Sequence, residues 1–133
     1  MAISTINVTV PYDVKAVWDI VTSLDDYAWR SDLGKITRLN EKQFIECTRD
    51  GFETTFTITC MEEYKRWEFD MENVNMKGHW TGVFSVHDAQ TTIDFTENVT
   101  AKKVFMKPFV GMYLKKQQTT YIQDLKKALE END

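Results

Sequence analysis

The stretch VPYDVKAVWDIVTSLDDYAWRSD, from Val10 to Asp32, contains the signals that decide the fold. A strand-like alternation of apolar and polar residues ends at Pro11, and proline is well placed at the start of a helix. Val14 and Trp18 lie on one face at helical spacing, which predicts a short amphipathic helix with Trp18 in the core. Residues 24–29 are predicted to form a second short helix, because their two aspartates would stabilise its positive N-terminal end.

Residues 35–101 alternate apolar and polar side chains in segments that are typical of strands. The segment from Trp67 to Met71 is a clear example, with charged residues between its apolar ones. Asp50-Gly51 is a strong tight-turn signal. Because the predicted loops are short, the six strands of this region are expected to form an antiparallel meander. The strand that precedes the opening stretch makes a seventh.

From Pro108 to Glu130 the apolar residues recur at spacings of three and four, which predicts a long amphipathic helix. At 1.5 Å per residue, ~23 residues span ~35 Å. A sheet with one apolar face must bury that face, and only this helix is long enough to cover it. We therefore predict an α+β fold: a seven-stranded curved antiparallel sheet wrapped around a long C-terminal helix, with two short helices after the first strand. The remaining hollow is either filled by large side chains or left as a pocket.

Composition narrows the class of protein. The 133 residues suit a single domain over residues 1–133, and their 42% hydrophobic content supplies a sizeable core. A formal net charge of −5 argues against a nucleic-acid partner. The sequence contains no run of ~18 apolar residues, so no integral membrane segment is predicted. The N-terminal residues lack the features of a signal peptide, which favours a cytoplasmic location. The sequence is compatible with a homodimer.

The cysteines and histidines predict neither a metal centre nor another cofactor. Cys47 and Cys60 lack a CxxC spacing and are expected to be reduced thiols. His79 and His87 share a strand parity opposite to that of Trp80, so we expect them to face solvent. Eight residues apart on one strand, they would be separated by ~27 Å at ~3.4 Å per residue. That separation excludes a shared metal ion.

The element order, with the opening stretch after the first strand, resembles the START-like superfamily, also called SRPBCC. Its helix-grip fold is that of polyketide cyclases, lipid-transfer START domains and plant pollen allergens. The resemblance is carried by Pro11, Asp13, Val17-Trp18, Asp25 or Asp26, Tyr27 and Trp29, and by the tail FVGMYLKKQQTTYIQDLKKALEE. Relatives often have a proline soon after the second tryptophan, where this chain has Arg30-Ser31-Asp32. The resemblance implies a deep, mostly apolar cavity between sheet and helix, but fold alone does not select an activity.

Glu97 is the clearest candidate for a catalytic residue. It shares strand parity with Phe95 and Val99, so its carboxylate is predicted to point inward. Burial would raise its pKa and suit it to general acid or base chemistry. The alternative is that Glu97 lies near a strand end, in solvent or bonded to the backbone.

Large rings and a few polar residues on apolar faces are the candidates for a ligand site, since such groups line small-molecule pockets. These residues are Tyr27, Trp29, Trp67, Asn73, Trp80, Phe95, Tyr113, Gln117 and Tyr121. For any single ring, filling of the core is the more common role. Gln117 either orients a ligand or caps the edge of the helix stripe, and Asn73 is either a cavity residue or the place where its strand bends.

Three functions are compatible with this sequence. The first is a small intracellular protein that binds an apolar or aromatic small molecule, or a lipid, in the cavity. The second is an enzyme of the polyketide cyclase and dehydrase type, in which Glu97 is the general base and Tyr113 or Gln117 holds an enolate oxygen. The third is a protein-interaction module like the co-chaperones of the superfamily, for which an exposed apolar patch would replace the cavity.

Overall fold

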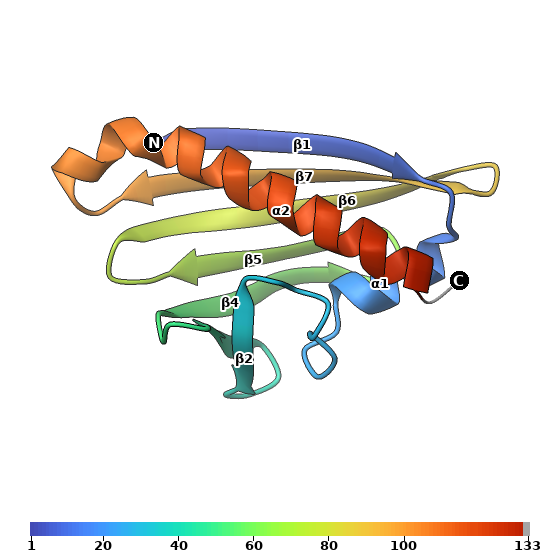
Figure 1. Cartoon of the computed structure of the whole chain (residues 1–133), viewed down its shortest axis with the longest axis horizontal. Coiled ribbons are helices and arrows are strands. Elements are labelled where there is room, and N and C mark those ends of the chain that lie inside the picture. Colours follow the sequence, from blue (N-terminus) through green and yellow to red (C-terminus); the bar gives the residue numbers. More distant parts are fainter. Residues whose placement is uncertain (132–133) are drawn as a thin grey trace.

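A computed structural model describes residues 1–131 of the chain. In chain order, its elements are β1 (Ala2–Val10), α1 (Val14–Val21), β2 (Leu33–Arg38), β3 (Gln43–Thr48), β4 (Glu53–Glu62), β5 (Arg66–Glu72), β6 (Met76–His87), β7 (Gln90–Ala101), the 3₁₀ helix η1 (Val104–Phe109) and α2 (Val110–Glu131). The long C-terminal helix lies diagonally across the sheet (Figure 1).

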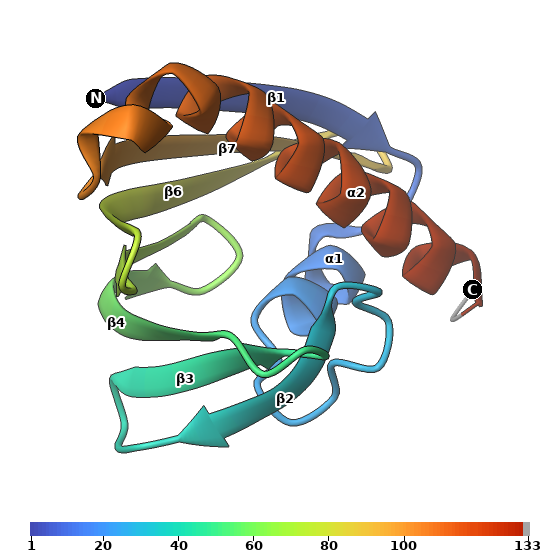
Figure 2. The same ribbon diagram turned by 60° about the vertical axis from the view of Figure 1, so that its left-hand side comes forward.

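The seven strands form one antiparallel sheet in the order β1-β7-β6-β5-β4-β3-β2. Strands β2 to β7 are a meander, and β1 pairs with the last of them. The segment between β1 and β2 therefore crosses from one edge of the sheet to the other. Figure 2 shows the sheet curling from β1 at the top to β2 at the bottom, with α1 and α2 on its hollow side. The predicted sheet and terminal helix are confirmed.

The predicted second short helix is wrong, because α1 is the sole α-helix between β1 and β2 in the described chain. Residues 22–32 instead form consecutive turns. The Ser23 hydroxyl accepts a hydrogen bond from the Asp26 backbone N–H at 3.0 Å, and the Tyr27 carbonyl accepts one from Arg30 N–H at 3.0 Å. Such side-chain bonds compete with helix formation, and a six-residue segment gains too few helical bonds to offset the cost of nucleation.

Helix α1 begins with a side-chain cap and anchors its tryptophan in the core. The Asp13 carboxylate accepts a hydrogen bond from the Ala16 N–H at 2.8 Å, which satisfies one of the free donors of the first turn. Trp18 is buried and packs edge-to-face on Phe84, with ring centroids 5.0 Å apart. Edge-to-face packing is favourable for aromatic quadrupoles. The prediction that Trp18 belongs to the core is confirmed.

Helix α2 starts at Val110, two residues after the predicted start, because Pro108 belongs to the preceding η1. Its buried stripe contains Val110, Leu114, Gln118, Ile122, Leu125, Ala128 and Leu129. Gln118 ties the helix to β1: its Nε2 donates to the Ser4 carbonyl at 2.9 Å, and its Oε1 accepts from the Ser4 hydroxyl at 2.8 Å. Both partners are buried, so these bonds satisfy groups that would otherwise destabilise the fold.

The hollow face of the sheet carries packed aromatic rings. Phe69 and Trp80 stack with centroids 4.7 Å apart, and Trp80 also meets Phe95 at 4.7 Å. The Trp80 ring lies over Gly82, where an added Cβ would come within 2.6 Å of a ring carbon. Gly82 is therefore required for the position of Trp80.

No helix within residues 1–131 is long and apolar enough to cross a membrane.

Candidate functional site

A cavity of about 150 Å³ remains between the sheet, α2 and the segment that joins β1 to β2. A cavity of about this volume is large enough for a benzene-sized group. All ten candidate residues lie in its wall: Tyr27, Trp29, Trp67, Asn73, Trp80, Phe95, Glu97, Tyr113, Gln117 and Tyr121. One space is therefore lined by the segment between β1 and β2, by strands β3 to β7 and by α2. Large side chains fill part of the hollow, and a pocket remains beside them.

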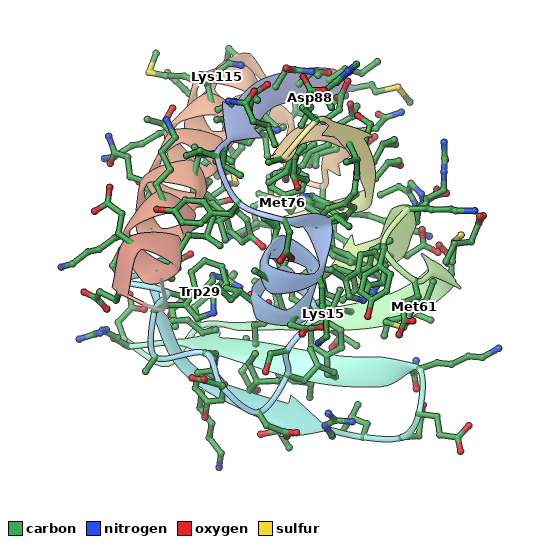
Figure 3. The ribbon with its side chains drawn as sticks, turned by 90° about the vertical axis from the view of Figure 1, so that its right-hand side faces the viewer. Lys15, Trp29, Met61, Met76, Asp88 and Lys115 are labelled. Atoms are coloured by element: carbon green, nitrogen blue, oxygen red, sulfur yellow. The ribbon has the colours of Figure 1, made fainter. Side chains whose placement is uncertain are left out.

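The cavity opens between the first half of α2 and the start of β2. The exposed residues of its wall are Asp32, Tyr113 and Gln117, whereas the rest of the wall is buried or half-buried. Trp29 lies between α2 and α1 (Figure 3). Its ring meets Tyr121 of α2 edge-to-face at 5.3 Å. The wall therefore has polar side chains at its exposed mouth and aromatic rings among its less exposed residues.

Glu97 lies in the wall with only 8% of its surface exposed. Within residues 1–131, no hydrogen bond is formed by its carboxyl group. Burial raises its pKa to about 7; the positive charge of Arg30 opposes this shift and the negative charge of Glu46 adds to it. Desolvation disfavours the charged form of a carboxyl group. Near neutral pH, Glu97 can therefore accept or release a proton.

Arg30 and Glu46 form a pair beside Glu97. Arg30 Nη1 and Nη2 donate to the two Glu46 carboxylate oxygens at 3.1 and 3.2 Å, the bidentate geometry that suits a guanidinium. Its guanidinium also lies 5.2 Å from the centre of the Tyr121 ring. Burial would lower the pKa of Arg30, but the charges of Glu46 and Asp32 outweigh that effect and keep it above the ordinary value. Arg30 is therefore a fixed positive charge.

The segment Arg30-Ser31-Asp32 is bonded to α2 through Ser31. The Asp124 carboxylate accepts hydrogen bonds from the Ser31 N–H at 2.9 Å and from its hydroxyl at 2.8 Å. With the Arg30–Glu46 pair, the crossing segment is bonded to both α2 and β3. These hydrogen bonds hold residues 22–32 in place, because this part of the chain contains no helix or strand.

Two indole N–H groups in the wall are unpartnered. Trp29 Nε1 and Trp67 Nε1 are buried, and neither finds an acceptor among the described residues. A buried donor without an acceptor costs roughly 1–3 kcal/mol. Such a group in a native structure calls for an explanation, and an oxygen or nitrogen of a bound molecule would supply the missing acceptor.

Tyr113 and Gln117 form a hydrogen-bonded pair at the mouth. Gln117 Nε2 donates to the Tyr113 hydroxyl oxygen at 2.8 Å, which leaves that hydroxyl free to donate its own proton. Partial burial, followed by the charge of Glu97, raises the pKa of Tyr113. Gln117 is exposed and lies at the edge of the buried stripe, whose polar member is Gln118.

Asn73 combines a wall position with a turn role. Its side-chain oxygen accepts from the backbone N–H groups of Asn75 and Met76 at 2.8 and 2.9 Å, and its amide donates to the Thr54 hydroxyl at 3.1 Å. Asn73 lines the cavity, and it lies in the turn that joins β5 to β6 rather than at a bend within a strand. Its polar atoms are already engaged in the protein.

Sequence reasoning missed Arg30, Glu46 and Gln118 as polar groups of this wall. Glu46 has the same signal that identified Glu97, because it lies two residues after the buried Phe44 on one strand. Gln118 follows Leu114 by four residues and so shares its helix face. Arg30 carries no such signal, since it lies in a turn.

The outer face of the sheet holds the histidine that sequence parity placed there. His79 Nε2 and Nδ1 lie 2.7 Å from carboxylate oxygens of Glu68 and Asp70, respectively. Cys47 and Cys60 are free thiols. In the described chain, no three His, Cys, Asp or Glu side chains gather closely enough to hold a metal ion.

A strongly curved antiparallel sheet, closed by one long helix over an internal cavity, defines a helix-grip protein. The sequence matches the model of the family described as polyketide cyclase / dehydrase and lipid transport over residues 1–130. The chain therefore belongs to this family of START-like proteins, as the sequence resemblance implied. No curated protein matches the chain.

Solved structures share this fold at low identity. A START superfamily protein from Mycobacterium smegmatis is 12% identical, with a TM-score of 0.90 and 100% of both chains covered. A conserved protein from Geobacillus kaustophilus is 8% identical, with a TM-score of 0.83 over 97% of this chain and 95% of its own. DynU16, from the dynemicin biosynthetic locus, is 17% identical, with a TM-score of 0.80 over 98% of this chain and 48% of its own. Similarity at these identities shows the fold alone.

Proposed function

We propose that this protein is a small intracellular binder of an aromatic or otherwise apolar small molecule that carries polar oxygens. The observation that supports the proposal is the cavity of about 150 Å³, whose wall combines aromatic rings with two unpartnered indole N–H donors. Ligand sites are mostly apolar with a few placed polar groups that set orientation. The aromatic wall supplies the burial, and Trp29 and Trp67 supply the donors.

A ligand oxygen on Trp67 Nε1 would relieve a buried donor that has no partner in the described chain. At the mouth, the Tyr113 hydroxyl can donate to a second oxygen, because Gln117 occupies one of its acceptor positions. We thus expect carbonyl or hydroxyl groups at two places on an otherwise apolar skeleton. A pure hydrocarbon would leave these donors unsatisfied and bind less tightly.

Native mass spectrometry on gently purified protein, compared with the denatured mass, tests whether a guest is retained. Titration of the apo protein with aromatic and acyl compounds, followed by tryptophan fluorescence, then gives affinities. Trp67→Phe removes the donor and keeps a ring, so affinity should fall about tenfold, the effect of roughly one hydrogen bond. Trp18→Phe is the matched control, since Trp18 is buried outside the cavity wall.

Gln117→Ala should weaken binding through the loss of its bond to Tyr113. Gln123→Ala is the corresponding control, because Gln123 is an exposed residue of α2 outside the wall. Equal affinities in wild type, Trp67→Phe and Gln117→Ala, for every compound that binds, would reject these assignments.

The alternative function is an enzyme of the cyclase and dehydrase type, and the pKa of about 7 of Glu97 favours it. A general base works best with a pKa near the working pH. In this scheme the Glu97 carboxylate takes a proton from a carbon next to a ligand carbonyl. The carbonyl oxygen becomes an enolate oxygen, and the Tyr113 hydroxyl or the Gln117 amide stabilises it by donating a hydrogen bond.

Hydrogen–deuterium exchange at the carbon next to the carbonyl of bound aromatic diketones tests the alternative. Glu97→Gln should retain binding and slow the exchange by roughly 10²–10⁴-fold, the usual contribution of a general base. Glu53→Gln, an exposed strand residue outside the wall, is the control. Exchange at the wild-type rate in Glu97→Gln would reject the enzyme alternative, and ligand binding would be the remaining proposal.

The protein-interaction function receives less support from this geometry. It predicted an exposed apolar patch in place of the cavity. The cavity is present, and the exposed apolar side chains of residues 104–113 occur in addition to it.

A further inference from the structure

Residues 104–113 expose an unusual amount of apolar surface. Of the eleven large hydrophobic side chains that are exposed in the described chain, five lie within these ten residues. Four of them form what we call the apolar strip: Val104 is 77% exposed, Phe105 72%, Phe109 63% and Met112 75%. The strip runs from η1 onto the first turn of α2. Exposed apolar clusters of this kind mark interaction sites.

The strip lies at one end of the molecule. Figures 1 and 2 both show η1 and the start of α2 at the end away from α1. The fifth exposed residue of the segment, Tyr113, follows Met112 directly and lines the mouth of the cavity. The apolar strip therefore adjoins the entrance through which a ligand reaches the cavity.

The charge around the strip is opposite to that of the whole chain. Residues 98–123 contain five lysines and no acidic residue, in a protein of formal net charge −5. Lys102 is paired with Glu72 at 2.7 Å, and Lys115 Nζ donates to the Thr5 carbonyl at 2.8 Å. Among the described residues, none forms an ion pair with Lys103, Lys107 or Lys116, and all three are exposed. We call these three the free lysines.

Exposed apolar side chains interleaved with free lysines match the surface of an anionic bilayer. Apolar groups enter the boundary between headgroups and acyl chains, and lysines attract acidic headgroups. A second copy of the chain fits less well, because a two-fold contact between two strips would bring the free lysines of both copies together. A bilayer supplies the complementary negative charge that a second strip lacks.

We propose that the apolar strip and the free lysines dock this protein on an anionic lipid surface, with the cavity mouth held at that surface. Phe105 and Phe109 enter the interfacial layer, and Lys103, Lys107 and Lys116 lie among the headgroups. A sparingly soluble molecule could then pass between bilayer and cavity. This docking is peripheral and requires no spanning helix.

Flotation with phosphatidylcholine vesicles, with and without phosphatidylserine, tests the proposal on the full chain. The protein should float only with the anionic vesicles. Binding should weaken as salt rises from about 0.1 M to about 1 M, where the screening length falls from about 10 Å to about 3 Å. Partition coefficients come from a vesicle titration, and circular dichroism checks that each variant is folded.

Two matched pairs of variants separate the strip from general surface effects. Phe105→Ser/Phe109→Ser should weaken partitioning by at least tenfold, whereas Leu39→Ser/Met61→Ser should leave it within about twofold, from the apolar area each removes from the contact. Leu39 and Met61 are 51% and 53% exposed. Figure 3 shows Met61 on the side of the molecule opposite α2.

The second pair tests the charges. Lys103→Gln/Lys107→Gln/Lys116→Gln should weaken binding about 100-fold, at about fivefold per lysine near an acidic surface. Lys42→Gln/Lys65→Gln/Lys126→Gln changes the net charge equally, at exposed positions outside the strip. It should retain most of the affinity.

Several results would overturn the docking proposal. They are an absence of wild-type flotation at low salt, equal losses in the test and control variants, and equal binding to neutral and anionic vesicles. A wild-type dimer that Phe105→Ser/Phe109→Ser converts to a monomer, without vesicle binding, would assign the strip to self-association instead. Ligand binding measured without vesicles is unaffected by any of these outcomes, so failure of the docking and of the proposed function are distinguishable.

Discussion

Replacing Glu97 with glutamine makes the burial of its carboxyl group measurable through the pH dependence of stability. Its pKa is raised by burial from the ordinary value of 4.5 to about 7. Below pH 4.5 the group is protonated in both the folded and the unfolded chain and contributes nothing. Between pH 4.5 and about 7 the unfolded chain loses the proton while the folded chain keeps it, so the folded state becomes less stable as pH rises.

The size of the effect follows from that interval. At 1.36 kcal/mol for each unit between the two pKa values, the wild-type free energy of unfolding should fall by about 3 kcal/mol across the window through this one group. Glu97→Gln keeps the shape and cannot ionise. Its stability relative to wild type should therefore rise by about 3 kcal/mol as pH increases, and then level off above pH 7.

Urea unfolding from roughly pH 4 to pH 9, at matched ionic strength, measures this difference. Glu53→Gln is the control, because Glu53 is exposed and its substitution should give a difference nearly independent of pH. A flat difference between wild type and Glu97→Gln would refute the argument. So would a carboxyl ¹³C titration that placed the pKa of Glu97 near its ordinary value.

Two further substitutions test the groups that position this site. Arg30→Gln should raise the pKa of Glu97 above about 7, because the guanidinium now lowers it; it should also destabilise the fold by about 3 kcal/mol. Arg38→Gln, which breaks an exposed ion pair, should cost less than about 1 kcal/mol in a urea titration. Gly82→Ala should displace the Trp80 ring, since the new Cβ would lie 2.6 Å from it. We expect a loss of about 1–3 kcal/mol and a changed near-ultraviolet circular dichroism spectrum, and an unchanged spectrum would contradict the packing argument.

The strands and the long helix could be predicted from the sequence because their signals are local. Alternation along β5, β6 and β7 identified the inward face correctly, from Trp67 to Phe95. The sequence could not show the register shift between Ile58 and Cys60, which interrupts the alternation of β4. Bulges insert a residue without changing composition.

The crossing between β1 and β2 was harder to predict because distant residues hold it. Ser31 bonds to Asp124, 93 positions away, and Arg30 bonds to Glu46. Local propensity favoured a helix over residues 24–29, but these tertiary bonds are made by turns. The candidates on strands and on α2 line the cavity because parity and helix phase bring them to one face, whereas an arginine in a turn has neither signal.

The positive charge of Arg30 acts on the two inward carboxyl groups of the cavity, Glu46 and Glu97. Arg30 commits both terminal nitrogens to Glu46. Glu97 therefore receives attraction without a hydrogen bond, while the charge of Glu46 opposes its ionisation. Buried polar groups in a stable fold usually have partners. Among the described residues, the buried side-chain polar atoms without a partner are the indole nitrogens of Trp29 and Trp67, and both tryptophans line the same cavity as Glu97. Packing of the core requires none of these polar atoms, and their concentration in one wall supports the proposed ligand site.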